Sequence, residues 1–78
     1  MAEVAGGTVK VIELVGSSPN SFSDAVRNAV RTASKSLRNI QGVEVISSNA
    51  TVGDNGELNN YKVNCKVAFL IEEGELGT

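Results

Sequence analysis

The side chains best suited to nucleophilic chemistry in this sequence are three serines and one cysteine. Ser17, Ser18 and Ser21 stand close together around a turn, and Cys65 is the single thiol. A nucleophile of either kind needs a neighbouring base, yet the chain contains no histidine and its carboxylates are scattered. Cys65 also alternates with apolar residues, which indicates a small buried side chain. We therefore predict that the protein is not an enzyme.

Two turns carry groups that could bind ions. The segment Gly16–Pro19 precedes an expected helix, and the free N–H groups at a helix start attract anions. The segment lacks the spacing and the lysine of a phosphate loop, so a capped turn explains it adequately. In the second turn Asp54, Asn55 and Glu57 offer oxygen ligands, without the spacing of an EF-hand. For Asp54 and Glu57, a calcium role and an ordinary polar turn both stay open.

Length and composition point to self-association. The chain has 78 residues, a net charge of −2 and one cysteine. A single domain of this size is marginally stable without a disulfide, a metal or oligomerisation, and an internal disulfide is impossible here. Acidic and basic residues are interspersed, which argues against a nucleic-acid partner. No signal peptide or membrane-spanning apolar run is evident, so we expect a cytoplasmic protein without membrane contact.

Hydrophobic periodicity predicts one domain over residues 8–72, with flexible ends at 1–7 and 73–78. A strand is expected at 8–15, with Val9, Val11 and Val15 on one face and Ile12 and Leu14 on the other. Apolar residues at three- and four-residue spacing then predict a helix from about residue 22 to about residue 40. Gly42 reads as the residue that stops this helix.

Two further strands are expected after the helix, at 43–52 and at 58–72. Between them, Gly53–Gly56 is a turn, and Asn55 and Gly56 suit a tight hairpin because both tolerate positive φ. The fold class is therefore α+β: a β-α-β-β chain whose three-stranded antiparallel sheet wraps around one helix. The last strand is long, and we expect part of it to overhang its partner as an open edge.

The last strand separates apolar and charged faces. Tyr61, Val63, Cys65, Val67 and Phe69 alternate with residues that include Lys62 and Lys66. Glu13 and Glu44 could lie on the lysine face of the neighbouring strands and pair with these cations. We interpret that face as a subunit interface with Ile46, Ala68 and Leu70 as its apolar part. A solvated face with paired charges is the alternative.

Several segments of the chain together resemble the dodecins. The match comprises Val11–Phe22, Asp24–Val30, Ala33–Asn39, Val43–Val45, Tyr61–Val63 and Lys66–Phe69, and it extends over about residues 9 to 72. The junction of the first strand with Gly16–Pro19 is its most specific part. The resemblance implies β-α-β-β subunits assembled into a hollow homododecamer. It also implies a cofactor, FMN or riboflavin, bound between subunits for storage or sequestration.

The resemblance also assigns ligand positions, and here the chain departs from the family pattern. It implies a flavin pocket at Gly42, Glu44 and Lys62. In flavin-binding dodecins a tryptophan stacks on the flavin at the position of Gly42, whereas this chain has no tryptophan. A glutamine that contacts the flavin is replaced by Lys62. The resemblance thus implies a flavin-type binding protein with weakened or lost flavin affinity. A structural or calcium-binding dodecin without an organic ligand is the alternative.

Overall fold

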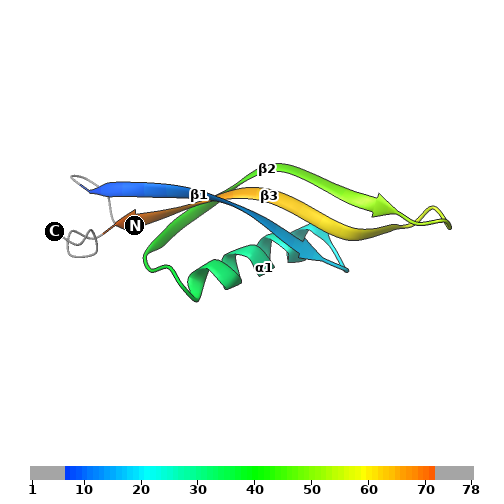
Figure 1. The fold of residues 1–78 in the computed structure, drawn as a ribbon, viewed down its shortest axis with the longest axis horizontal. Helices are drawn as coiled ribbons and strands as arrows, with labels where there is room; N and C mark the ends of the chain where they lie inside the picture. Colours follow the sequence, from blue (N-terminus) through cyan, green and yellow to red (C-terminus); the bar gives the residue numbers. More distant parts are fainter. Residues whose placement is uncertain (1–6, 72–78) are drawn as a thin grey trace.

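The computed structural model describes residues 7–71, which form one helix and three strands. In chain order these are β1 (Thr8–Ser18), α1 (Phe22–Ser34), β2 (Ile40–Val52) and β3 (Leu58–Ile71). The molecule is elongated, 55 × 20 × 16 Å, with α1 lying along one face of the sheet (Figure 1). The predicted β-α-β-β fold with a three-stranded antiparallel sheet is confirmed. Apart from Gly7, the ends predicted to be flexible lie outside the described residues.

The strand order is β1-β3-β2, so the long strand β3 is central. From Tyr61 to Ile71 it pairs with β1 on one side, and it pairs with β2 on the other side along most of its length. The expectation of an overhanging β3 edge was therefore wrong over most of that strand. The helical crossover makes β1 and β2 parallel to each other, and β3 fills the space between them. The free edges of the described sheet belong to β1 and β2.

The start of α1 is fixed by side-chain capping. Ser21 is the N-cap, and its Oγ accepts a hydrogen bond of 3.0 Å from the Asp24 amide. The buried Ser18 Oγ accepts another, 2.9 Å long, from the Asn20 amide and so closes the turn before the helix. The bond to the Asp24 amide satisfies one of the backbone donors that the first helical turn leaves without intrahelical partners. The three clustered serines thus include two that shape the strand-to-helix junction.

The end of α1 lies earlier than the sequence pattern predicts. The helix stops at Ser34, with Lys35 as its C-cap, and Asn39 adopts φ 62° before β2 begins at Ile40. Gly42 lies inside β2 and is not a helix cap, so that prediction was wrong. Ile40 fits the helical spacing, but it pairs with Phe69 of β3 instead. Strand pairing outweighs the local periodicity here, because a β-branched residue such as Ile40 favours a strand over a helix.

The core is small and lies between α1 and the middle of β3. Three alanines of the helix, Ala25, Ala29 and Ala33, face three buried residues of β3: Val63, Cys65 and Val67. Leu14 and Val26 pack at the margin of this cluster. Phe22 meets Tyr61 edge to face, with ring centroids 4.9 Å apart, and this contact closes one end. Alanines on the helix allow its backbone to approach the sheet closely.

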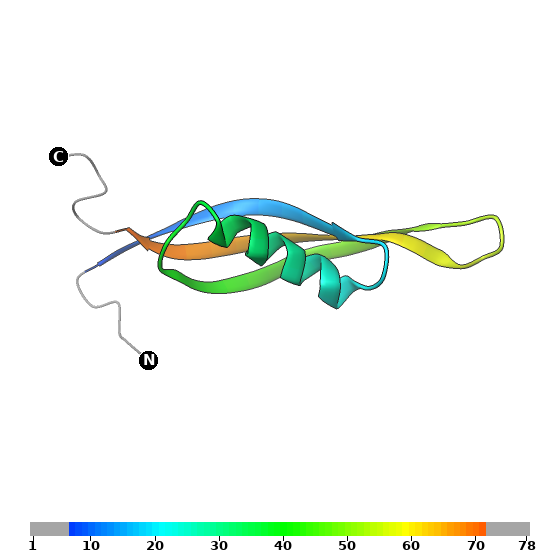
Figure 2. The same ribbon diagram turned by 90° about the horizontal axis from the view of Figure 1, so that it is seen from below.

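The β2–β3 hairpin closes through a turn in which Gly56 alone among residues 53–57 takes positive φ, 83°. The Gly56 amide donates to the Gly53 carbonyl oxygen at 2.9 Å, and the Gly53 amide donates to the Glu57 carbonyl oxygen at 2.8 Å. This is a three-residue hairpin loop in which Gly56 adopts the left-handed conformation. The predicted hairpin turn is present, and of the two residues that tolerate positive φ only Gly56 adopts it. Figures 1 and 2 both show the end of this hairpin projecting past β1 and α1.

Gly16 provides a test of the close contact between β1 and α1. A Cβ at this position would overlap the Ala25 carbonyl oxygen and lie 2.8 Å from the Ala29 Cβ. We expect Gly16→Ala to lower the free energy of unfolding by roughly 1–3 kcal/mol, because rigid helix backbone must move. Urea denaturation measures this change. Gly42→Ala is the matched control, since its Cβ would meet nothing within 4 Å; equal losses in both variants would contradict the steric account.

Candidate functional site

The sheet face turned away from α1, called the outer face here, contains the charged and apolar positions that the sequence singled out. Lys66 lies centrally on it, opposite Glu13 of β1 and Glu44 of β2. The predicted cross-strand matching of acids and lysine is therefore observed at Lys66. Lys62 instead lies between Ser17 and Asn49, which are uncharged. Opposite charges on neighbouring strands stabilise this register, as expected for an exposed face.

Apolar side chains surround this charged row and remain exposed. Val11 and Val15 of β1 are 51% and 64% exposed, and Val9 is 40% exposed. On β2, Ile46 occupies an irregularity in the register between Val45 and Ser47 and is 44% exposed. Strand β1 thus presents one apolar face to the helix and a second one to the outside. The single protomer leaves this second face without a protein partner among residues 7–71.

The helix also leaves part of its own side of the sheet uncovered. It packs mainly against β1 and β3 and touches β2 little, and Figure 2 shows it lying obliquely across the sheet. Val43 and Val45 pair with the buried residues Val67 and Cys65, yet they remain 43% and 53% exposed. One helix is too narrow to cover three strands. Exposed apolar residues therefore occur on both sides of the sheet.

The three positions of the implied ligand pocket share the outer face but are not gathered in one protomer. Gly42 lies opposite Ala68, and Glu44 lies beside it opposite Lys66. Lys62 is six residues from Ala68 along β3, which corresponds to roughly 20 Å of strand. A Cβ built on Gly42 meets no heavy atom within 4 Å, so the space beside it is open. Any pocket that uses all three positions has to combine them from different copies.

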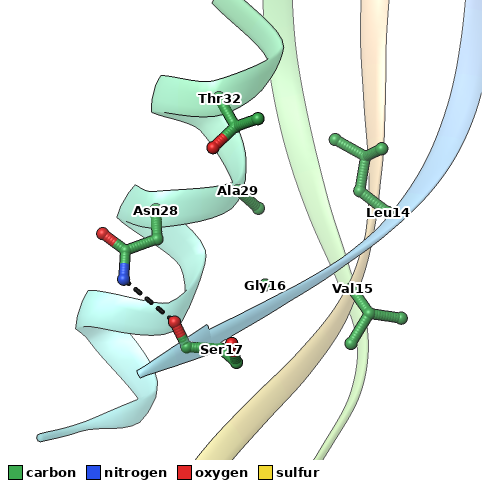
Figure 3. A pocket seen from close by; sticks show the side chains of 7 residues that line it. All are labelled: Leu14, Val15, Gly16, Ser17, Asn28, Ala29 and Thr32. Carbon is green, nitrogen blue, oxygen red and sulfur yellow. Dashed lines mark hydrogen bonds between the residues drawn. The ribbon is translucent and has the colours of Figure 1, made fainter. Parts of the chain in front are cut away.

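A hollow that the sequence did not reveal lies between α1 and the free edge of β1 (Figure 3). Its volume is about 230 Å³, with Leu14, Gly16 and Ala29 as apolar lining and Asn28 and Thr32 on the helix side. The Asn28 side-chain amide donates a 2.9 Å hydrogen bond to the Ser17 carbonyl oxygen and so fastens the helix to the strand edge. The sequence signal that could have indicated this contact is the position of Asn28, a polar residue at the flank of the apolar helix stripe.

The acidic residues Asp54 and Glu57 lie at the exposed tip of the β2–β3 hairpin. Of the loop side chains, Asn55 accepts a 3.0 Å hydrogen bond from the Glu57 amide through its Oδ1 and so stabilises the turn. Within residues 7–71, no group of three or more histidine, cysteine, aspartate or glutamate side chains is arranged to hold a metal ion. In the same part of the chain, no helix is long and apolar enough to cross a membrane.

Cys65 lies at the centre of the core and is fully buried. Burial raises the pKa of its thiol, because the thiolate loses hydration there. A thiol with a raised pKa is a poor nucleophile at neutral pH. The structure therefore agrees with the interpretation of Cys65 as a small core residue.

Comparison with known proteins identifies the family. The family model described as Dodecin matches residues 8–72. The chain belongs to the dodecin family. A dodecin from Thermus thermophilus is 35% identical over 68 residues, which are 87% of this chain and 97% of that protein. A calcium dodecin from Mycobacterium tuberculosis is 33% identical over 66 residues, covering 85% of this chain and 92% of the relative.

A solved structure supports the same assignment. Dodecin from Streptomyces coelicolor superposes with a TM-score of 0.82 at 38% identity, covering 88% of this chain and 97% of that chain. The resemblance seen in the sequence is thereby confirmed. Dodecins are non-enzymatic binding proteins, in agreement with the prediction that this chain is not an enzyme. Members of the family form homododecamers, and the relatives named above include both a dodecin and a calcium dodecin.

The buried thiol gives a pH prediction for this dodecin-family chain. Its pKa is raised in the folded protein, whereas in the unfolded chain it returns to about 8.5. As the pH rises above that value, the unfolded chain releases a proton that the folded chain retains, so the free energy of unfolding falls. At pH 7 and below, well under that value, the thiol contributes almost no pH dependence. Urea denaturation between pH 7.5 and 9.5 should show this fall in the native protein.

Cys65→Ala provides the control for this measurement, because it removes the titrating group and keeps a small apolar side chain. It should lose the fall in stability above pH 8.5 while keeping any slope from other groups. Identical pH profiles for the two proteins would mean that Cys65 ionises as readily in the folded chain as in the unfolded chain.

Proposed function

We propose that this chain assembles as a homododecamer and binds a small molecule in pockets formed between its subunits. The observation that carries the proposal is the outer face of β1, where Val9, Val11 and Val15 are 40–64% exposed. Covering such a face with other copies removes apolar surface from water at about 25 cal/mol per Å². A chain with one small core gains much of its stability this way. Family membership supports twelve as the number of subunits.

The ligand class we propose is a flavin, FMN or riboflavin, held for storage with reduced affinity. The family resemblance supports the class, and Gly42 supports the reduction. A glycine presents no aromatic ring on which an isoalloxazine could stack, and the chain has no tryptophan to replace it. Glu44 and Lys62 are the remaining polar positions of the pocket. An exposed lysine can contact a phosphate group, which would favour FMN over riboflavin.

A second candidate is a structural or calcium-binding assembly without an organic ligand. The 33% identity to a protein named calcium dodecin favours it, as do the carboxylates of Asp54 and Glu57 at the hairpin tip. Two such carboxylates are too few for a calcium site, so ligands from other subunits would complete it. The calcium version predicts that a chelator lowers the melting temperature and that added calcium restores it. The purely structural version predicts no response to either.

The assembly is tested first. At micromolar concentration we expect multi-angle light scattering to give a mass about twelve times the 8.1 kDa of the chain. Val11→Lys should reduce this mass, because it introduces a desolvated charge on the outer face. Lys10→Glu, which changes an exposed residue on the opposite face of the same strand, is the comparison variant. A monomeric or dimeric native protein at this concentration would refute the homododecamer.

The ligand is tested by restoring an aromatic ring. We expect Gly42→Trp to bind FMN roughly 5-fold more tightly than the native chain, because stacking contributes about 1 kcal/mol beyond buried area. Quenching of FMN fluorescence measures both affinities. Gly42→Leu is the matched control, since it adds bulk to the same open space without a π face. Equal affinities of the Trp and Leu variants would show that the pocket differs from a flavin site by more than one residue.

A further inference from the structure

The part of the β2–β3 hairpin that extends beyond β1, called the arm here, has exposed apolar side chains. An arm surrounded by solvent would not need them. Val52 and Leu58 face each other across the two strands and are 62% and 49% exposed. Strand β1 ends opposite Tyr61, so only two strands continue beyond that point. Two-stranded hairpins without a covered apolar face are marginally stable in water. The arm therefore has the composition of a segment that packs against another surface.

The tip of this arm is also acidic. It contains Asp54 and Glu57, and no lysine or arginine occurs between residues 39 and 61. Figures 1 and 2 show that the arm extends from the end of the molecule near the start of α1, opposite the end at which α1 finishes. Within one protomer the arm projects past β1 and α1 and so is not packed against them. A complementary surface for it must be basic at the margin, apolar at the centre, and located on another molecule.

The hollow at the β1 edge has these properties. Leu14, Gly16 and Ala29 form its apolar lining. At its margin the Arg31 guanidinium donates a 3.0 Å hydrogen bond to the Asn28 Oδ1, while the Asn28 amide donates to the Ser17 carbonyl oxygen at 2.9 Å. This chain of bonds positions a cation beside the apolar lining (Figure 3 shows the Asn28–Ser17 bond). The adjacent edge of β1 has no strand partner within the described residues.

We propose that the hairpin tip of one copy docks into the β1–α1 hollow of a second copy. Val52 and Leu58 cover the apolar lining, and the tip carboxylates, above all Glu57, approach Arg31. Opposite charges at the rim of an interface direct orientation and partner choice, while the apolar contact supplies the stabilisation. Each copy inserts its arm into one neighbour and receives the arm of another neighbour in its own hollow. The contact is therefore head-to-tail and can close into a ring or shell. The inference rests on the assembly proposed above and specifies one of its contacts.

A charge swap in the full-length protein tests this contact. Glu57→Lys and Arg31→Glu each place like charges together, so each should raise the protein concentration at half-dissociation by about tenfold, which is 1.4 kcal/mol. The double variant restores an opposite pair with reversed sign and should return most of the loss. Mass photometry during dilution, at low salt and in moderate urea if necessary, gives the midpoints. Far-UV circular dichroism shows whether each protomer stays folded.

Two further variants separate the contact from general charge and hydrophobicity effects. Thr8→Lys adds one positive charge at an exposed site roughly 20 Å along β1 from Leu14, and it matches the charge change of Glu57→Gln. We expect Glu57→Gln, but not Thr8→Lys, to weaken assembly. Leu58→Thr should also weaken it, since it retains β propensity but loses apolar area.

The possible outcomes distinguish this contact from the proposed function. If the native protein assembles but neither single charge reversal changes its midpoint, the tip-to-hollow contact is wrong and the homododecamer stands. If both reversals weaken assembly and the double variant gives no recovery, the two residues do not meet, and the contact is again wrong. Unchanged midpoints together with binding of the hairpin tip to an unrelated protein would reassign the arm to a different partner. Recovery in the double variant supports the contact.

Discussion

The 13-residue helix α1 is narrower than the three-stranded sheet on which it lies. This mismatch is the constraint on which the rest of the structure depends. The helix approaches the sheet closely because Gly16 and three alanines lie at the contact, and it buries Val63, Cys65 and Val67. It does not cover Val43 and Val45 at one side, and it cannot reach the outer face at all. The apolar area left over can be removed from water only by other protein surface, since residues 7–71 contain no second helix and a single cysteine cannot form an internal disulfide.

The same geometry explains why the binding positions make no pocket within one protomer. Cross-strand pairing places Gly42, Glu44 and Lys62 on the outer face, but the length of β3 separates the first two from the third. The proposed ligand binding therefore depends on the proposed assembly, because the space beside these positions is open in one copy and would be enclosed only by a second copy. Gly42 affects the two roles differently. Its missing side chain leaves the strand pairing intact, while it removes the group that would contact an aromatic ligand.

The sequence predicted much of the fold because its patterns are strong where the packing is simple. The alternation from Tyr61 to Phe69 identified the buried face of β3, and Ser21 with Asp24 identified the start of α1. One error fell at Ile40 and Gly42, where a helical spacing of apolar residues continues into a strand, and another was the overhanging edge expected for β3. Local periodicity cannot distinguish these states, since both bury the same side chains. The hollow at Asn28 was missed because its two walls are eleven residues apart in sequence.

By itself, the sequence determined that this is a small β-α-β-β domain without catalytic groups, with dodecin-like segments and without a tryptophan. These properties follow from residue types and short-range spacing. The tertiary structure decided that β3 is central, that Lys66 lies between two glutamates, and that the end of the β2–β3 hairpin projects past β1 and α1 (Figure 1). These properties depend on which strands pair and in which register. The free energy of pairing depends on which side chains become buried between segments far apart in the sequence, and a local pattern does not specify this.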